Sequence, residues 1–481
     1  MLQLRDYPAT TAPPAPSLLD RLGEMVGVAG VVCCQWRGHW KRTGPETAAA
    51  DVHLLVDPAW AERMDGALDC LGFKPAGPSE AQIPGSATWF GYDAGRDTMV
   101  RVHVLVRLVI GGPSTTVYRL PIERAVLETA VPGRLFPVPA AELEFIMFVL
   151  RLVQAYGLRD LFGPQPPEWL VEARPEFNYL LAQVDRQELV ARLEELLPTV
   201  DVPFFDACAR SLRPGASRWQ RLWLRWSLHR RLGPPLCRPP LPVLLRRIAR
   251  GLRMLPRARR VRLAHGGNVI ALVGSEGTGK STCVAELDRW LARHFDVMAA
   301  HLDHPPRSLT TRAVSGLLAL RRSLRRAWDG GAVEGGVLEL VRLASAARDR
   351  YRLFTKVRRF AAAGGIALCE SYPVEQTRLV VGPEIARLLG HGRDTRVARR
   401  LLRAEQGYYR HITLPDVIIA LIVEPETAVR RTRNEPADSV RVHSRIMLEA
   451  DWSGTGAHLV DAERPLAHVL ADVKSLVWSD V

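Results

Sequence analysis

The stretch VGSEGTGKST, residues 273–282, decides how the second half of this chain folds. It fits the pattern G-x-x-x-x-G-K-[ST], with Gly274, Gly279, Lys280 and Ser281 at the fixed positions. The apolar run NVIALVG before it predicts a buried strand, and KSTCVAELDRWLARHF after it predicts a helix. A strand, a glycine-rich loop and a helix start favour a phosphate-binding loop, because backbone N–H groups and the helix dipole converge there. The alternative is a glycine turn that matches a short pattern by coincidence.

Each position of the loop has an expected role. Lys280 is expected to reach the β- and γ-phosphates of ATP, and the Ser281 hydroxyl is expected to bind Mg²⁺. Only five of the 65 basic residues are lysines, so lysine at this position is informative: a compact charge suits the loop better than a forked guanidinium. The predicted nucleotide-binding residues are Gly274, Ser275, Glu276, Gly277, Thr278, Gly279, Lys280, Ser281 and Thr282.

Length and composition are those of a globular protein. The 481 residues, 47% hydrophobic and 24% charged, predict about two to four domains and a sizeable core. No apolar run is long enough for a membrane span, and the Pro-rich start of the chain lacks the apolar centre of a secretory signal. Seven cysteines without C-x-x-C spacing argue against disulfides or zinc and for a reducing cytoplasm, so we expect a cytoplasmic protein.

The net charge of +14 is concentrated in one segment. Residues 207–275 contain 16 arginines and no acidic residue, so the remainder carries 14 − 16 = −2. This distribution argues against a diffuse nucleic-acid-binding surface and for one local interaction. We therefore expect no specific nucleic-acid partner.

The chain is expected to have four parts. They are a flexible leader (1–21), an α+β block (22–206), a basic helical linker (207–265) and an α/β block with a parallel sheet (266–481). In the α+β block, ADVHLLV (50–56) and TMVRVHVLVRLVI (98–110) predict strands, and AAELEFIMFVLRLVQAYGL predicts a largely buried helix.

The basic linker predicts two amphipathic helices. RWQRLWLRWSLHRR places Trp219, Leu222, Trp223 and Trp226 on one side, and VLLRRIARGLRML repeats the pattern. Such helices bind anionic membranes in some proteins, which here would involve residues 218–254. We favour packing on the protein itself, because the helices lie between domains.

The α/β block offers further groups for phosphoryl transfer. Ile366 to Cys369 predict a strand, and Glu370 follows at its carboxyl end, where it is expected to contact Mg²⁺ or act as a base. The stretch LPDVIIALIVEPETAVRRTR predicts a strand and a helix that starts near Pro425. The arginines after it predict a lid that stabilises transition-state charge, although any one of them could simply be solvated. These arginines are Arg431, Arg433, Arg441 and Arg445.

The α/β block resembles thymidylate-kinase-like P-loop kinases. The stretches that carry the resemblance are GSEGTGKST, CESYP in the place of the family's Asp-Arg-Tyr, and LPDVIIALIVEPETAVRRTR with its Arg-rich lid. The resemblance implies a P-loop kinase fold and a Glu276 that contacts the sugar of an acceptor nucleotide. Glu370 replaces the family's Asp and Ser371 its phosphate-binding Arg, which implies an acceptor other than thymidylate.

The front block resembles nucleotidyltransferase-like domains through DVHLLVDPAWAERMDGALDCLGF. Active members use Asp-x-Asp and a third carboxylate to bind two Mg²⁺. Here His53 follows Asp51 in place of the second acid, and the later strand offers Arg101 and His103, so we expect a degenerate domain that binds a ligand or partner. Nearly the whole chain resembles uncharacterised bacterial proteins that fuse the two domains, with the basic segment as the loosest part of the resemblance.

These observations predict a cytoplasmic kinase that depends on ATP and Mg²⁺ and uses a nucleotide or sugar-like acceptor. Lys280, Glu370 and the four arginines are the expected catalytic residues, and Ser281 and Glu370 the metal ligands. The first alternative is an ATP-dependent regulatory switch, which the loss of arginine at Ser371 favours. The second is a membrane-associated assembly factor without kinase turnover. A homodimer is compatible with the sequence.

Overall fold

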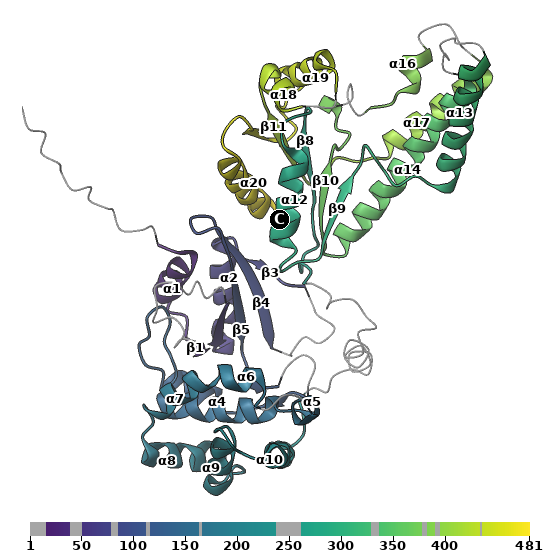
Figure 1. The fold of residues 1–481 in the computed structure, drawn as a ribbon. Helices are drawn as coiled ribbons and strands as arrows, with labels where there is room; N and C mark the ends of the chain where they lie inside the picture. The colour runs from purple at the N-terminus through teal and green to yellow at the C-terminus, as the bar shows by residue number, and fades with distance from the viewer. Residues whose placement is uncertain are drawn as a thin grey trace, which may run out of the picture. The chain divides into compact units, whose positions relative to one another are not determined.

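The computed structural model describes ten stretches of the chain, which fall into two compact units. The described residues are 16–38, 51–77, 85–111, 116–162, 166–236, 261–328, 336–377, 382–389, 395–432 and 435–481. Unit 1 is Met1–Arg257 and unit 2 is Ala258–Val481 (Figure 1). Each unit has its own five-stranded sheet and its own hydrophobic cores, which confirms the expected mixture of helices and parallel strands.

Unit 1 contains a mixed sheet in the order β1-β2-β5-β4-β3. Only β2 and β5 are parallel, and the other neighbours are antiparallel. The strands are β1 (Cys33–Arg37), β2 (Asp51–Val56), β3 (Lys74–Pro75), β4 (Ser86–Asp93) and β5 (Thr98–Leu105). The strand predicted from ADVHLLV is confirmed as β2. The strand predicted over 98–110 is confirmed only as far as Leu105, where β5 ends, because Val109–Ile110 form β6 in a separate two-stranded sheet.

The two faces of this sheet differ because side chains alternate along each strand. On one face, Val52, Leu54 and Val102 are buried against α1 (Leu18–Val28) and α2 (Ala61–Cys70), which follows a 3-10 turn at Pro58–Trp60. The other face carries apolar residues at one end, where Leu55 and Leu105 join the helical core. Elsewhere on this face, Asp51 and His53 of β2 and Arg101 and His103 of β5 are polar and only half-buried.

The helical part of unit 1 is arranged around α4 (Ala141–Ala155). This helix is buried on nearly every side, as its continuous apolar sequence predicts. A short two-stranded sheet of β6 (Val109–Ile110) and β7 (Tyr118–Arg119) precedes it. The other helices are α3 (Glu123–Glu128), α5 (Leu158–Phe162), α6 (Glu168–Glu172), α7 (Arg174–Leu181), α8 (Arg186–Leu196), α9 (Val202–Ser211) and α10 (Arg218–Arg231).

Helix α10, the first helix of the basic segment, packs on its own protein as expected, against α4, α5 and α9. The prediction that the tryptophan side of this helix is its packing face is wrong. Leu224 and Leu228 are buried in the helical core, whereas Trp219, Trp223 and Trp226 are at least half exposed. The boundary expected after residue 206 falls inside α9, and the second predicted helix lies outside the described residues. In the described part of the chain, no helix has the length and apolar character to cross a bilayer.

Unit 2 contains a fully parallel sheet in the order β12-β11-β8-β10-β9, which confirms the parallel sheet predicted for the α/β block. The glycine-loop strand β8 is at its centre. The strands are β8 (Val269–Gly274), β9 (Val297–His301), β10 (Ile366–Glu370), β11 (Val417–Ile422) and β12 (His458–Asp461). Because all five strands are parallel, their carboxyl ends lie at one edge of the sheet.

Helices cover both faces of this sheet. Helix α14 (Val337–Ala362) and α19 (Ala437–Glu449) contribute Phe354, Val357 and Met447 to the core on one face. Helices α12 (Lys280–Leu291) and α20 (Leu466–Asp480) contact each other and neighbouring strands. The remaining elements are α13 (Leu309–Trp328), a 3-10 turn at Glu375–Thr377, α16 (Ile385–Leu389), α17 (Arg396–Arg410) and α18 (Pro425–Arg431).

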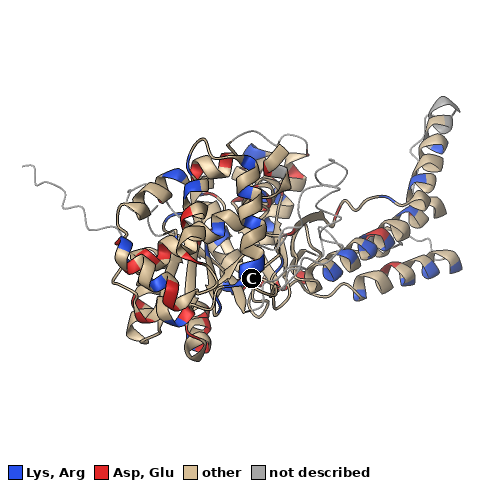
Figure 2. Ribbon diagram, turned by 90° about the horizontal axis from the view of Figure 1, so that it is seen from below, with Lys and Arg blue, Asp and Glu red and all other residues tan. Residues whose placement is uncertain are grey.

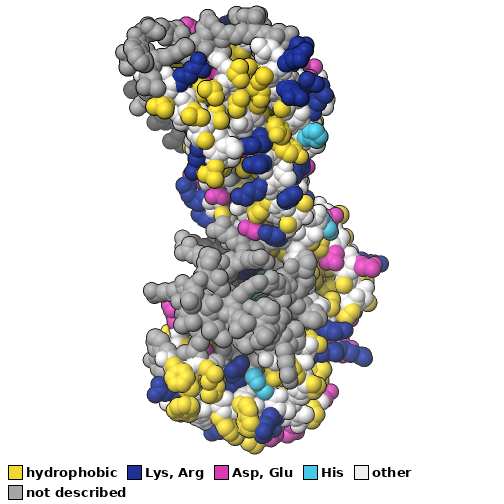
Figure 3. Space-filling view, turned by 90° about the vertical axis from the view of Figure 1, so that its right-hand side faces the viewer, with side chains coloured by type: hydrophobic (Ala, Val, Ile, Leu, Met, Phe, Trp, Pro, Cys, Tyr) yellow, Lys and Arg dark blue, Asp and Glu magenta, His cyan; other side chains and the backbone are white. Residues whose placement is uncertain are grey.

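The long helices of unit 2 have a basic surface. Helix α14 contacts both α13 and α17, and blue segments recur along the long helices in Figure 2. The buried side of this group holds apolar residues such as Leu343 and Ala398. In Figure 3, Lys and Arg side chains share the viewed face with hydrophobic ones. Positive charge is therefore found outside the basic segment as well.

Candidate functional site

The glycine-rich loop joins the central strand of unit 2 to a helix, as predicted. Strand β8 ends at Gly274, and α12 begins at Lys280. Gly277 and Gly279 have φ angles of 75° and 88°, in the left-handed region that favours glycine. Gly279 is the N-cap residue of α12, and as a glycine it has no side chain to accept a hydrogen bond from the backbone N–H groups of the first turn. The N–H groups at this helix start can therefore bind an external acceptor.

The side chain of Lys280 reaches back across the glycine-rich loop. Its Nζ donates a hydrogen bond to the carbonyl oxygen of Ser275 at 2.7 Å, and the Thr278 hydroxyl donates to the same oxygen at 2.9 Å. Burial lowers the pKa of Lys280, whereas the carboxylates of Glu276 and Glu370 act in the opposite direction. A half-buried ammonium at the start of a helix suits an anion with several oxygens.

Glu370 lies at the carboxyl end of β10, beside the loop. Its carboxylate accepts a hydrogen bond from the Ser281 hydroxyl at 2.6 Å, although the two residues are 89 positions apart in the chain. Strands β8 and β10 are neighbours with Leu272 opposite Glu370, which is why the two groups meet. A hydroxyl and a carboxylate are oxygen ligands of the kind that Mg²⁺ prefers.

Two features beside Glu370 were not predicted. The Nε2 atom of His301, at the end of β9, lies 3.7 Å from Glu370 Oε1, and burial lowers the pKa of His301 despite this carboxylate. The rule that placed Glu370 at a strand end applies equally to His301. Ser371 has φ of 55°, a strained conformation for a residue other than glycine. Strain of this kind often occurs at functional sites.

The expected lid contacts the loop through an unpredicted residue. His443 of α19 lies with its Nδ1 3.1 Å from Oε2 of Glu276, so the loop carboxylate holds the lid helix. Helix α18 also approaches closely, because a Cβ at Gly277 would lie 2.6 Å from the carbonyl oxygen of Ala428. Nothing in the sequence pattern distinguished His443 from the arginines around it.

The four predicted lid arginines differ in their surroundings. Arg431 donates to the carbonyl oxygen of Ala462 at 2.8 Å, and Arg441 pairs with Glu426 and Asp438. Arg445 is exposed on α19, and Arg433 lies outside the described residues. The structure therefore brings Lys280, Ser281 and Glu370 together, and it places Arg431 and Arg441 against other partners. 

The polar positions of the unit 1 sheet also meet. Asp51 is paired with Arg101, whose Nε lies 3.2 Å from Oδ1. Burial opposes ionisation of Asp51, but hydrogen bonds from His103 and Arg101 outweigh it and lower the pKa of this carboxyl. Burial, together with the neighbouring His103 and Arg37, lowers the pKa of His53 to about 3. The neighbours of Asp51 are thus imidazoles and a guanidinium.

Comparison of the chain with protein-family models finds no match, and comparison with curated proteins finds none.

Proposed function

We propose that unit 2 is an ATP- and Mg²⁺-dependent phosphotransferase that passes the γ-phosphoryl group to a nucleotide or sugar-like acceptor. The observation that carries this proposal is the contact between Ser281 and Glu370 at 2.6 Å, directly beside the lysine of the glycine-rich loop. Phosphoryl transfer depends on positioning and charge stabilisation, which these three groups together can supply.

The residues at the loop fit the phosphates of a nucleotide. A Cβ at Gly279 would meet no atom within 4 Å, so the loop has open space at this position. Backbone N–H groups of residues 274–282 would bind phosphate oxygens, and Lys280 would exchange the Ser275 carbonyl for them. Ser281 and Glu370 would hold Mg²⁺, which when bound neutralises charge on the phosphate oxygens. Glu370 would alternatively act as a base toward the acceptor hydroxyl.

The lid residues would exclude water and supply positive charge. Helix α19 is already attached to the loop through His443 and Glu276, so a ligand that contacts Glu276 would alter this attachment. Arg445 is on the same helix, two residues beyond His443. Arg431 and Arg441 would need to leave their present partners before they could reach a phosphate. Closure of this kind sequesters the reaction from water.

The acceptor site would differ from that of a thymidylate kinase. The strand-end residue after Glu370 is Ser371 rather than arginine, and serine cannot form the bidentate contact with a monophosphate that arginine makes. A nucleotide of another kind or a nucleotide sugar would therefore be the better acceptor.

Lys280→Ala is the variant that tests the proposal. We expect it to abolish ATP binding while the unit stays folded, because the ammonium meets the phosphates where their charge is concentrated. Lys356→Ala is the matched control, since Lys356 is an exposed lysine of the same unit. Binding is measured by calorimetry with ATP and Mg²⁺, and folding by circular dichroism. Equal ATP affinity in the folded Lys280→Ala variant and the wild type would contradict the proposal.

A regulatory switch is the second candidate. The ion pairs of Arg441 with Glu426 and Asp438 favour it, because an arginine in these pairs stabilises the lid and does not contact a phosphate. An ATP-consumption screen with nucleoside monophosphates and nucleotide sugars separates the two. ATP binding without turnover on any acceptor would support the switch.

A further inference from the structure

The polar patch on the sheet of unit 1 is built by strand register. Strands β2 and β5 are parallel, with Asp51 opposite Arg101 and His53 opposite His103. Residues two apart on a strand point to the same face, so these four side chains form a compact square. Val52 and Val102, which alternate with them, are fully buried on the opposite face. A one-residue slip would bury the polar group, so the register is strongly specified.

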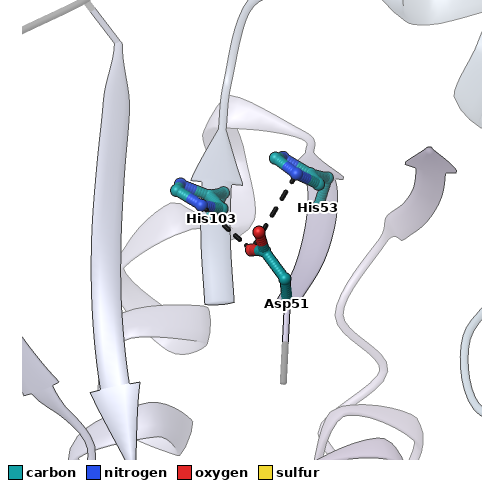
Figure 4. A group of neighbouring side chains, drawn as sticks. All are labelled: Asp51, His53 and His103. Atoms are coloured by element: carbon teal, nitrogen blue, oxygen red, sulfur yellow. Dashed lines mark ion pairs between the residues drawn. The ribbon is translucent and has the colours of Figure 1, made fainter. Parts of the chain in front are cut away.

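Three of these side chains direct ligand-type atoms at one another. Figure 4 shows the carboxylate of Asp51 beside the two imidazoles, with an ion pair drawn from it to each ring. Its Oδ1 lies 3.1 Å from Nε2 of His103 and 3.9 Å from Nε2 of His53. The imidazole rings are stacked, with centroids 4.5 Å apart and planes within 8° of parallel. One nitrogen from each ring and one carboxylate oxygen all lie within 4.8 Å of one another.

The surroundings orient two of the three groups. The Nδ1 of His103 lies 3.0 Å from the Thr88 hydroxyl, which can accept an N–H from the ring and leave Nε2 free as a ligand. Arg101 contacts both oxygens of Asp51. A carboxylate offers about four lone-pair positions, so Oδ1 keeps one for a further partner, now directed at His103.

We propose that Asp51, His53 and His103 bind a divalent transition metal of the zinc class, through Oδ1 of the aspartate and Nε2 of each histidine. Two imidazoles and one carboxylate suit Zn²⁺ and its neighbours, whereas Mg²⁺ needs more oxygen ligands than this cluster has. Tetrahedral bonds of about 2.0–2.1 Å place ligand atoms about 3.4 Å apart, so the 3.1 Å contact already fits. Binding requires His53 to move closer to the other two.

The metal would remain accessible from solvent. The side chains of Asp51, His53 and His103 are 39%, 19% and 25% exposed. Three protein ligands leave a fourth position open in a tetrahedral site, as in catalytic rather than structural zinc centres. The site is thus suited to a metal that takes a water molecule or a small ligand.

Zinc binding by the full-length protein tests this assignment. The protein is stripped of metal and then titrated with Zn²⁺ against a chromophoric chelator, in excess Mg²⁺ so that oxygen sites in unit 2 are occupied. We expect one Zn²⁺ per chain, with an affinity that His103→Gln lowers by about tenfold or more and Thr88→Val by about 10–100-fold. His468→Gln, which removes an exposed histidine of unit 2, should leave the affinity unchanged.

Co²⁺ gives a second readout. Its visible absorption bands are intense when it has about four ligands in a near-tetrahedral arrangement and weak when it has six. We expect these bands in the wild type and their loss in His103→Gln. If that variant does not fold, as judged by circular dichroism without metal, the nearly isosteric Asp51→Asn replaces it. Failure of the wild type to retain Zn²⁺, or equal Zn²⁺ affinity in the wild type and folded cluster variants, would overturn the assignment.

Discussion

Two glycines of the same loop should respond differently to alanine. Gly277 and Gly279 both have left-handed backbones, with φ of 75° and 88°. A methyl group at Gly277 would lie 2.6 Å from the carbonyl oxygen of Ala428 and 2.8 Å from the Thr432 hydroxyl. A methyl group at Gly279 would meet no atom within 4 Å. The pair therefore separates backbone strain from steric overlap.

The magnitudes follow from these surroundings. Left-handed backbone costs an alanine about 1–2 kcal/mol, so Gly279→Ala should lower the free energy of unfolding of unit 2 by that amount. Gly277→Ala adds the overlap with α18, and overpacking of this kind typically costs about 1–3 kcal/mol more. For ATP binding we expect the opposite order: relative to the stability that each substitution costs, Gly279→Ala should weaken ATP binding more than Gly277→Ala. The methyl group at residue 279 stands in open space beside the helix start, where we expect phosphate.

Denaturant unfolding of the full-length variants measures the first effect, and hydrogen exchange in residues 425–432 localises it to α18. Calorimetry with ATP and Mg²⁺ measures the second effect, and we expect Gly279→Ala to weaken ATP binding by about tenfold, or 1.4 kcal/mol. Equal destabilisation by the two substitutions would refute the steric argument. Unchanged ATP affinity in Gly279→Ala would refute the assignment of the open space to phosphate.

Three further predictions concern single residues. Arg221→Ala should destabilise unit 1 by about 2–4 kcal/mol, because this buried guanidinium donates hydrogen bonds to two backbone carbonyls. Trp223→Ala, on the exposed side of the same helix, should change the stability by less than about 0.5 kcal/mol. Thermal unfolding of the two variants compares these effects. Burial raises the pKa of Asp349, but hydrogen bonds led by that from Thr311 outweigh it and lower the pKa. The unfolded state then binds the proton more tightly, so this stabilisation is present above pH of about 4 and is lost as the pH falls further. In acid unfolding, the Asp349→Asn variant should therefore lose less stability below this pH than the wild type does. Thymidylate should be at least about tenfold poorer than the true acceptor, and Ser371→Arg should raise its use by about one to two decades in steady-state kinetics. Efficient use of thymidylate by the wild type would show that another arginine binds the phosphate.

Much of the local structure could be predicted from the sequence. The strand, loop and helix around Lys280 are encoded by neighbouring residues, because an apolar run, glycines and helical spacing act over a few positions. The strand that ends at Glu370 and the helix that starts at Pro425 were predicted for the same reason. In a parallel sheet the carboxyl ends of the strands share one edge, which places Glu370 at the edge that carries the loop.

Only the tertiary structure decided which groups meet and which faces are covered. The tryptophans of α10 make an apolar side, yet the covered side holds Leu224 and Leu228, because the neighbouring helices and not the helix itself determine what is buried. Asp51 and His103 come together through the register of two strands that are about 50 residues apart in the chain. Motifs report local conformation, whereas pairing between distant strands depends on the packing of the whole unit. For that reason the sequence by itself determined the loop, and the fold decided the partners of Glu276 and Asp51.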